Sequence, residues 1–180
     1  EMKIVNPATG ATLKELEVDT SSSIAEKFKR AKAAQASWAS TTLASRLDIV
    51  REFRARLAKD KEQLAQILTS EVGKPIAQAR NEVGGTLGRI DFFVEQAANV
   101  LKDEPVFKDA SMEEVIQHEP LGVIANISAW NYPDFVGSNV FIPALLAGNA
   151  VLYKPSEFAT LTGLAISDRL HESGVPRDVF

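Results

Sequence analysis

Polar side chains follow two short apolar runs at positions where they could act together. The first run ends in residues 129–133 (AWNYP), and the second, about twenty residues later, ends in residues 154–157 (KPSE). Residues 135–149 between them are apolar and numerous enough for a crossover helix. This order predicts a strand, a helix and a parallel strand. Both polar groups would then lie at the carboxyl edge of an open α/β sheet, where such sheets bind ligands.

Asn131 has the clearest chemistry of the first group. Its side-chain amide is a hydrogen-bond donor, and Pro133 restricts the backbone that follows. A donor held rigidly at the end of a buried strand could stabilise an oxyanion, which is worth on the order of 3 kcal/mol per donor in a dry site. An Asn near a proline also often caps a helix or closes a turn, and residue chemistry alone favours this alternative.

Lys154 and Glu157 form the second group. The lysine can donate to the hydroxyls of a ribose and the glutamate can accept from the same sugar, so the two side chains complement each other around a diol. The alternative is an ordinary exposed ion pair between residues three apart, which contributes little to stability.

Composition excludes several classes of function. The sequence has no cysteine, so this chain alone forms no thiolate nucleophile, disulfide or cysteine metal site, and we predict no metal centre. Twenty basic and 24 acidic residues give a net charge of −4, and the basic residues are scattered, which argues against a nucleic-acid partner. No apolar run approaches the roughly 18 residues of a membrane span, and residues 1–4 do not form a charged-then-apolar signal segment. We therefore expect no membrane partner and a cytoplasmic location.

The pattern of apolar residues predicts the order of the elements. Residues 3–18 alternate around a turn at 6–10 and predict a hairpin. From residue 22 to about 101 the period is helical and fits three helices, of which the second stops at Gly73 and the third starts at Pro75. A second hairpin and a βαβα unit follow, with the hairpin at 106–118, strands at 122–127 and 150–153, and helices at 136–147 and 160–173.

Glycines in the helical region invite two interpretations. Gly73 and Lys74 suggest a phosphate loop, but Pro75 replaces the Ser or Thr that such a loop requires, so we reject that function. Three further glycines lie within a helical pattern without a preceding strand, and we expect them to serve close helix packing: Gly84, Gly85 and Gly88.

Several of these motifs resemble the amino-terminal part of NAD(P)-dependent aldehyde dehydrogenases in both order and spacing. The resemblance extends over nearly the whole chain and rests on residues 33–38 followed by Arg46, 70–75 (SEVGKP), 119–133, 143–150 (PALLAGNA) and 154–157.

The resemblance implies an α/β fold, with amino-terminal helices, the first βαβα half of a Rossmann-like parallel sheet and a projecting β-hairpin. Residues 1–105 and 119–180 would form part of the dinucleotide-binding domain. Residues 106–118 would be the hairpin of an oligomerisation arm in a homodimer or homotetramer, or else an edge hairpin of the sheet. The catalytic domain, with its cysteine nucleophile and glutamate base, would lie outside this chain.

The resemblance also implies roles for individual residues. Asn131 would be the catalytic oxyanion donor, and Ala129 departs from the proline common at its position. An acidic residue at the position of Glu157 accompanies NAD use, so NADP is the less expected cofactor. The cofactor would contact Ile127, Ser128, Ala129, Trp130, Asn131, Lys154, Ser156 and Glu157, and the substrate tunnel would begin at Tyr132, Phe135 and Val136.

These roles predict the cofactor-binding portion of an oxidoreductase that oxidises a small aldehyde to a carboxylic acid with NAD(P). The isolated chain would be inactive because it lacks the nucleophile. Two alternatives remain open from the sequence. One is a related acyl-CoA-forming or acyl-phosphate-reducing dehydrogenase, and the other is a non-catalytic scaffold.

Overall fold

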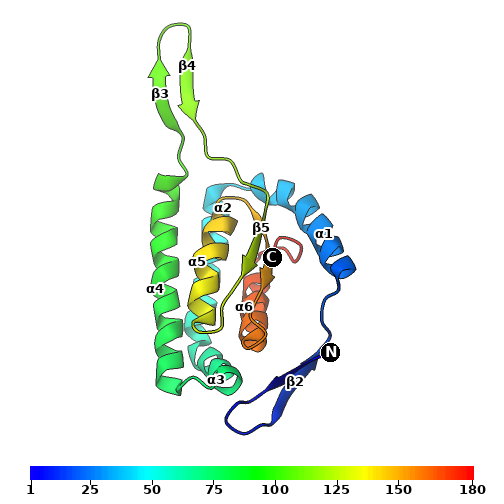
Figure 1. The fold of residues 1–180 in the computed structure, drawn as a ribbon. Coiled ribbons are helices and arrows are strands. Elements are labelled where there is room, and N and C mark those ends of the chain that lie inside the picture. The colour runs from blue at the N-terminus through cyan, green and yellow to red at the C-terminus, as the bar shows by residue number, and fades with distance from the viewer.

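The computed structural model describes residues 1–180 and contains six helices and three separate two-stranded sheets (Figure 1). The mixed α/β class predicted from the sequence is confirmed. A parallel strand pair lies in the middle of the molecule, and the helices gather around it (Figure 1). None of the six helices has both the length and the apolar character needed to span a membrane.

The parallel pair carries the predicted βαβα unit. Strand β5 (Val123–Ile127) leads through α5 (Pro133–Leu146) to β6 (Ala150–Lys154), and α6 (Thr160–Glu172) follows. Ile127 pairs with Lys154 in the register, so both strands end at the same edge. Helix α5 begins three residues before the predicted position, because the fixed backbone of its first residue, a proline, suits the first turn of a helix.

Two antiparallel hairpins flank this unit, as predicted. The first joins β1 (Met2–Val5) to β2 (Thr12–Leu16) and the second joins β3 (Glu104–Lys108) to β4 (Glu113–Ile116). The second hairpin starts two residues before the expected range of 106–118. It projects beyond the end of the long helix α4 (Ile76–Val100), away from the body of the molecule, and all residues of its two strands are exposed (Figure 1).

The amino-terminal region contains four helices, so the prediction of three is wrong. They are α1 (Ser21–Ala39), α2 (Leu43–Lys59), α3 (Lys61–Val72) and α4 (Ile76–Val100). The error lies at Asp60, where the chain leaves helical geometry for one residue although no glycine or proline marks the break.

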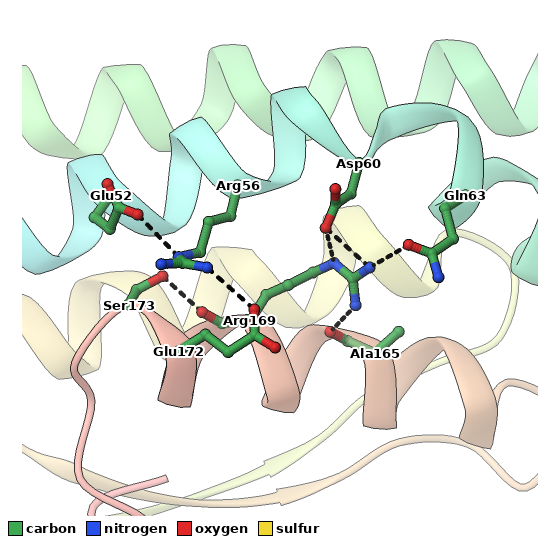
Figure 2. A network of polar contacts seen from close by, with 8 residues as sticks. All are labelled: Glu52, Arg56, Asp60, Gln63, Ala165, Arg169, Glu172 and Ser173. Atoms are coloured by element: carbon green, nitrogen blue, oxygen red, sulfur yellow. Dashed lines mark hydrogen bonds and ion pairs between the residues drawn. The ribbon is translucent and has the colours of Figure 1, made fainter.

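A buried arginine explains the break at Asp60. The Asp60 carboxylate does not cap α3 and instead accepts from Arg169 Nε of α6 at 3.1 Å (Figure 2). Arg169 also donates to Gln63 Oε1 at 2.9 Å and to the carbonyl of Ala165 at 3.0 Å. The guanidinium is almost fully buried, and these contacts satisfy it while tying α6 to the junction of α2 and α3.

The carboxyl end of α5 is held by side chains from the first two helices. Trp38 Nε1 donates to the carbonyl of Leu145 at 3.0 Å, and Arg46 Nε donates to the carbonyl of Leu146 at 2.9 Å. The last carbonyls of a helix have no partner within the helix. The carbonyl of Leu145 also accepts from the amide of Gly148 at 3.1 Å, whereas the carbonyl of Leu146 is satisfied by Arg46. Phe53 and Phe141 pack edge to face in the core beside them, with ring centroids 6.3 Å apart.

Helical glycines fall into two groups. Gly163 lies so close to the loop after β6 that a Cβ there would stand 2.5 Å from Pro155 Cβ, whereas a Cβ at Gly85 or Gly88 would meet nothing within 4 Å. The expectation of close helix packing is therefore wrong for Gly85 and Gly88, which face open space on α4. At Gly84 a Cβ would meet only the ammonium group of Lys61, at 3.3 Å.

This contrast predicts opposite effects for the same substitution. Gly163→Ala should lower the free energy of unfolding by about 1–3 kcal/mol, because the added methyl collides with a rigid proline ring. Gly85→Ala should raise it by about 0.5–1 kcal/mol, because alanine loses less backbone entropy in a helix. Urea unfolding followed by circular dichroism measures both. Equal effects at the two positions would show that α6 does not approach Pro155 as described.

Candidate active site

The loops that follow β5 and β6 lie side by side at the carboxyl edge of the strand pair. The register places Ile127 beside Lys154, and the amide of Ser128 continues the ladder by donating to the carbonyl of Lys154 at 3.0 Å. Further along, the rings of Trp130 and Phe158 meet edge to face with centroids 5.7 Å apart. The structure therefore brings together the two polar groups that the sequence placed at one edge.

Asn131 is exposed in the first of these loops and its side-chain amide makes no hydrogen bond. Helix α5 has Tyr132 as its N-cap residue and receives no side-chain cap from either residue. The alternative that Asn131 caps this helix is therefore wrong, and its amide is free to bind a ligand.

The backbone around Asn131 is held by a lysine from another part of the chain. Lys74 precedes α4, and its ammonium group donates to the carbonyl of Asn131 at 2.6 Å. The same group forms an ion pair with Glu82 and lies 4.1 Å from the centroid of the Tyr132 ring. The Lys74 side chain is only 11% exposed and that of Glu82 is fully buried, so the two charges attract each other more strongly than they would in water.

Glu82 also binds the first turn of α5. Its Oε1 accepts from the amide of Asp134 at 3.0 Å, one of the donors that a helix leaves unpaired at its amino end. Lys74 and Glu82 together therefore hold the carbonyl of Asn131 and the amide of Asp134, at the two ends of the segment that carries the candidate oxyanion donor.

Glu71, at the end of α3, does the same for α6. Its carboxylate accepts from the amides of Leu161 and Thr162 at 2.6 and 2.9 Å and from the Thr162 hydroxyl at 3.0 Å. Burial raises the pKa of Glu71, and these hydrogen bonds oppose the shift. Helix α6 has no cap of its own at Ala159, so Glu71 supplies it and fixes the helix that follows the second loop.

Lys154 and Glu157 face each other in the second loop. Lys154 Nζ lies 3.2 Å from Glu157 Oε2, and the two side chains are 61% and 58% exposed. Hydrogen bonds from its own backbone amide and then from Lys154 lower the pKa of Glu157, so it is ionised at neutral pH. An accessible cation beside an accessible carboxylate fits the donor and acceptor needs of a ribose diol.

The other predicted site residues occupy different surroundings. Ser156 is buried, and its hydroxyl accepts from the amide of Phe158 at 3.2 Å, so it shapes its own loop. Tyr132 is exposed, whereas Phe135 and Val136 are half-buried within α5. The Phe135 ring lies 5.3 Å from the guanidinium carbon of Arg89 on α4. Ile127 is exposed and Ala129 is half-buried in the loop that carries Asn131.

The amino-acid sequence matches the aldehyde dehydrogenase family over residues 1–180. The chain belongs to this family. An N-succinylglutamate 5-semialdehyde dehydrogenase of Novosphingobium aromaticivorans is 32% identical over 173 residues, which are 96% of this chain and 36% of that protein. The chain thus spans about a third of the length of this aldehyde dehydrogenase.

Solved structures agree with the family assignment. An NADP-dependent enzyme of Escherichia coli superposes with a TM-score of 0.93 at 27% identity, covering 99% of this chain and 37% of that one. A structure from Sinorhizobium meliloti 1021, complexed with NAD, superposes with a TM-score of 0.91 at 28% identity, covering 98% and 36%. These neighbours confirm the Rossmann-like fold. Because both cofactors occur among them, the expectation that NADP is the less favoured cofactor of this protein gains no support.

Sequence reasoning missed the residues that hold the aldehyde dehydrogenase motifs in place. Lys74 belongs to the run SEVGKP that resembles the family, but the sequence does not show that its ammonium group reaches the loop of Asn131. Glu82 and Asp134 were not singled out, and the sequence does not show which groups they contact. A charged residue at a helical position that should face the core was the one available signal.

Asp134 is the most unusual of these groups. It is 3% exposed, and its Oδ2 has no hydrogen-bond partner. Burial, and then the charge of Glu82, raise the pKa of Asp134 from 3.8 to about 8. Other groups also act on this carboxyl: Lys74 and Arg169 oppose the shift, and Glu71 adds to it.

This shift predicts a pH-dependent stability. The unfolded chain releases the Asp134 proton near pH 3.8 and the folded chain near pH 8, so the free energy of unfolding falls as pH rises between these values. The slope can approach about 1.4 kcal/mol per pH unit. Asp134→Asn should abolish this contribution, so its stability relative to the parent should grow from pH 5 to pH 8 in denaturant titrations. Parallel curves for the two proteins would contradict the assignment.

Proposed function

We propose that this chain is the cofactor-binding portion of an enzyme that oxidises an aldehyde to a carboxylic acid with NAD(P). The observation that carries the proposal is the unbonded amide of Asn131, held by its backbone at the carboxyl edge of the parallel strands and next to the loop of Lys154 and Glu157. Family membership supports the same reaction class.

In this reaction Asn131 donates a hydrogen bond to the carbonyl oxygen of the aldehyde when a nucleophile adds to the carbonyl carbon. The negative charge on that oxygen grows in the transition state, so a donor fixed beforehand lowers the barrier more than it stabilises the bound substrate. The chain contains no cysteine, so a thiolate nucleophile would come from residues outside it.

A bound NAD(P) would supply the acceptor for the hydride of the substrate carbon. Lys154 and Glu157 would orient the adenosine ribose, with the ammonium donating to a hydroxyl and the carboxylate accepting from one. The backbone of residues 127–131 would line the nicotinamide half. Tyr132, Phe135 and Val136 would form the start of the substrate tunnel.

Within this proposal, NAD is the preferred cofactor. The carboxylate of Glu157 is ionised and exposed on the loop after β6. The 2′-phosphate of NADP would replace the hydroxyl from which Glu157 accepts and would bring like charges together, which disfavours that cofactor. The solved neighbours use either NAD or NADP, so this preference rests on Glu157 alone.

The projecting hairpin is the proposed contact between subunits of a homodimer or homotetramer. Its strands β3 and β4 are exposed throughout and carry large apolar side chains, namely Val106, Phe107, Val115 and Ile116. Such a ribbon has unpaired strand edges that a second chain can cover.

Asn131→Ala tests the proposed chemistry in the full-length protein. We expect kcat to fall roughly a hundredfold or more, with the affinity for NAD nearly unchanged, because the amide acts on the transition state. Stopped-flow or steady-state measurement of NADH formation, with cofactor binding measured separately, gives both quantities. Equal kcat in variant and parent would reject the role of Asn131.

Glu157→Ser tests the cofactor preference. The parent should have a higher kcat/KM with NAD than with NADP. In Glu157→Ser the ratio of these two values should be smaller, because kcat/KM with NADP rises once the repelling charge is removed. Lys154→Ala is the matched control. It should weaken the binding of both cofactors, since an ammonium can donate to a hydroxyl or to a phosphate. A parent that prefers NADP, or a ratio unchanged in Glu157→Ser, would show that this carboxylate does not face the ribose.

A further inference from the structure

The contacts around Asn131 point to residues that act on the reaction from a distance. A buried ion pair is costly to desolvate, and an apolar pair of similar volume would usually serve stability equally well. Lys74 and Glu82 form hydrogen bonds that an apolar pair cannot form, because both bind backbone groups of the loop that carries the candidate oxyanion donor.

The two contacts bracket a short segment. Lys74 holds the carbonyl of Asn131 at 2.6 Å, and Glu82 holds the amide of Asp134 at 3.0 Å. Between them, the ring of Tyr132 lies 4.1 Å from the Lys74 ammonium, and Pro133 has a restricted backbone and no amide hydrogen. Every residue of the segment is therefore fixed by covalent geometry or by this ion pair.

We propose that Lys74 and Glu82 are positioning residues that hold the backbone of Asn131 so that its side-chain amide points at the developing oxyanion. The inference rests on the proposed role of Asn131. Neither residue touches the substrate. They set the direction of the donor before the reaction. Their loss should therefore slow the chemical step and change the binding of substrate or cofactor much less.

The test is a double-mutant cycle in the full-length protein. Lys74→Met removes the ammonium and keeps a side chain of similar length, and it is made in the parent and in the Asn131→Ala background. Lys74→Arg, which keeps the charge and the donor, should recover part of the lost kcat. The matched control is Arg54→Met. It breaks a bidentate ion pair between Arg54 of α2 and Asp91 of α4, the helix that also carries Glu82, and it does not touch the loop of Asn131.

We expect Lys74→Met to lower kcat about tenfold or more, with KM for aldehyde and cofactor changed less than about threefold, and Arg54→Met to keep the parent kcat. In the Asn131→Ala background, Lys74→Met should lower kcat by less than about a further twofold, because the donor that Lys74 positions is already gone. Full activity of Lys74→Met, a loss that multiplies with that of Asn131→Ala, or an equal loss in Arg54→Met would overturn the positioning role. No loss in Asn131→Ala alone would instead overturn the proposed function.

A second variant covers the case in which Lys74→Met does not fold, which a thermal melt reveals. Glu82→Gln keeps an acceptor for the amide of Asp134 and weakens the hold on Lys74. It should lower kcat severalfold in the parent and have no further effect in the Asn131→Ala background. An unchanged kcat in a folded Glu82→Gln variant would count against the proposal.

Discussion

The arrangement of the site depends on the backbone amides at the amino ends of α5 and α6, which have no partner within their own helices. Neither helix has a side-chain cap of its own, yet both begin inside the fold directly after the loops that carry the candidate functional groups. Two buried carboxylates, Glu82 and Glu71, supply the missing acceptors from the corner between α3 and α4. One helical corner therefore places both loops, because a helix start that is fixed in space also fixes the residues just before it.

The other end of α5 is held in the same way. Trp38 and Arg46 donate to its last carbonyls, so the crossover helix is fixed at both ends by the amino-terminal helices. This explains how a region that contributes no candidate ligand-binding group can still matter to the site. The two-stranded sheet is small and needs this support, since two paired strands alone are only marginally stable in water.

Much of the fold follows from the sequence, because apolar periodicity and turn residues are local signals. They predicted the βαβα unit, both hairpins and the stop at Gly73, and the motifs placed Asn131 and Lys154 at one edge. The break at Asp60 was missed because its cause, Arg169, lies more than one hundred residues away in sequence. Lys74, Glu82 and Asp134 were missed for the same reason: their contacts join segments whose pairing no local pattern reveals, and only the folded chain shows which backbone groups need a partner.

Hydrogen exchange at three amides tests the central claim most directly. First-turn helix amides usually exchange quickly, because they have no partner within the helix. Asp134, Leu161 and Thr162 should instead exchange as slowly as core amides, since buried carboxylates accept from them. The amide of the exposed Ser22, in the first turn of α1, should exchange quickly in the same sample. If the three amides exchanged as quickly as that of Ser22, the helical corner would not hold the two loops, and the account would be contradicted.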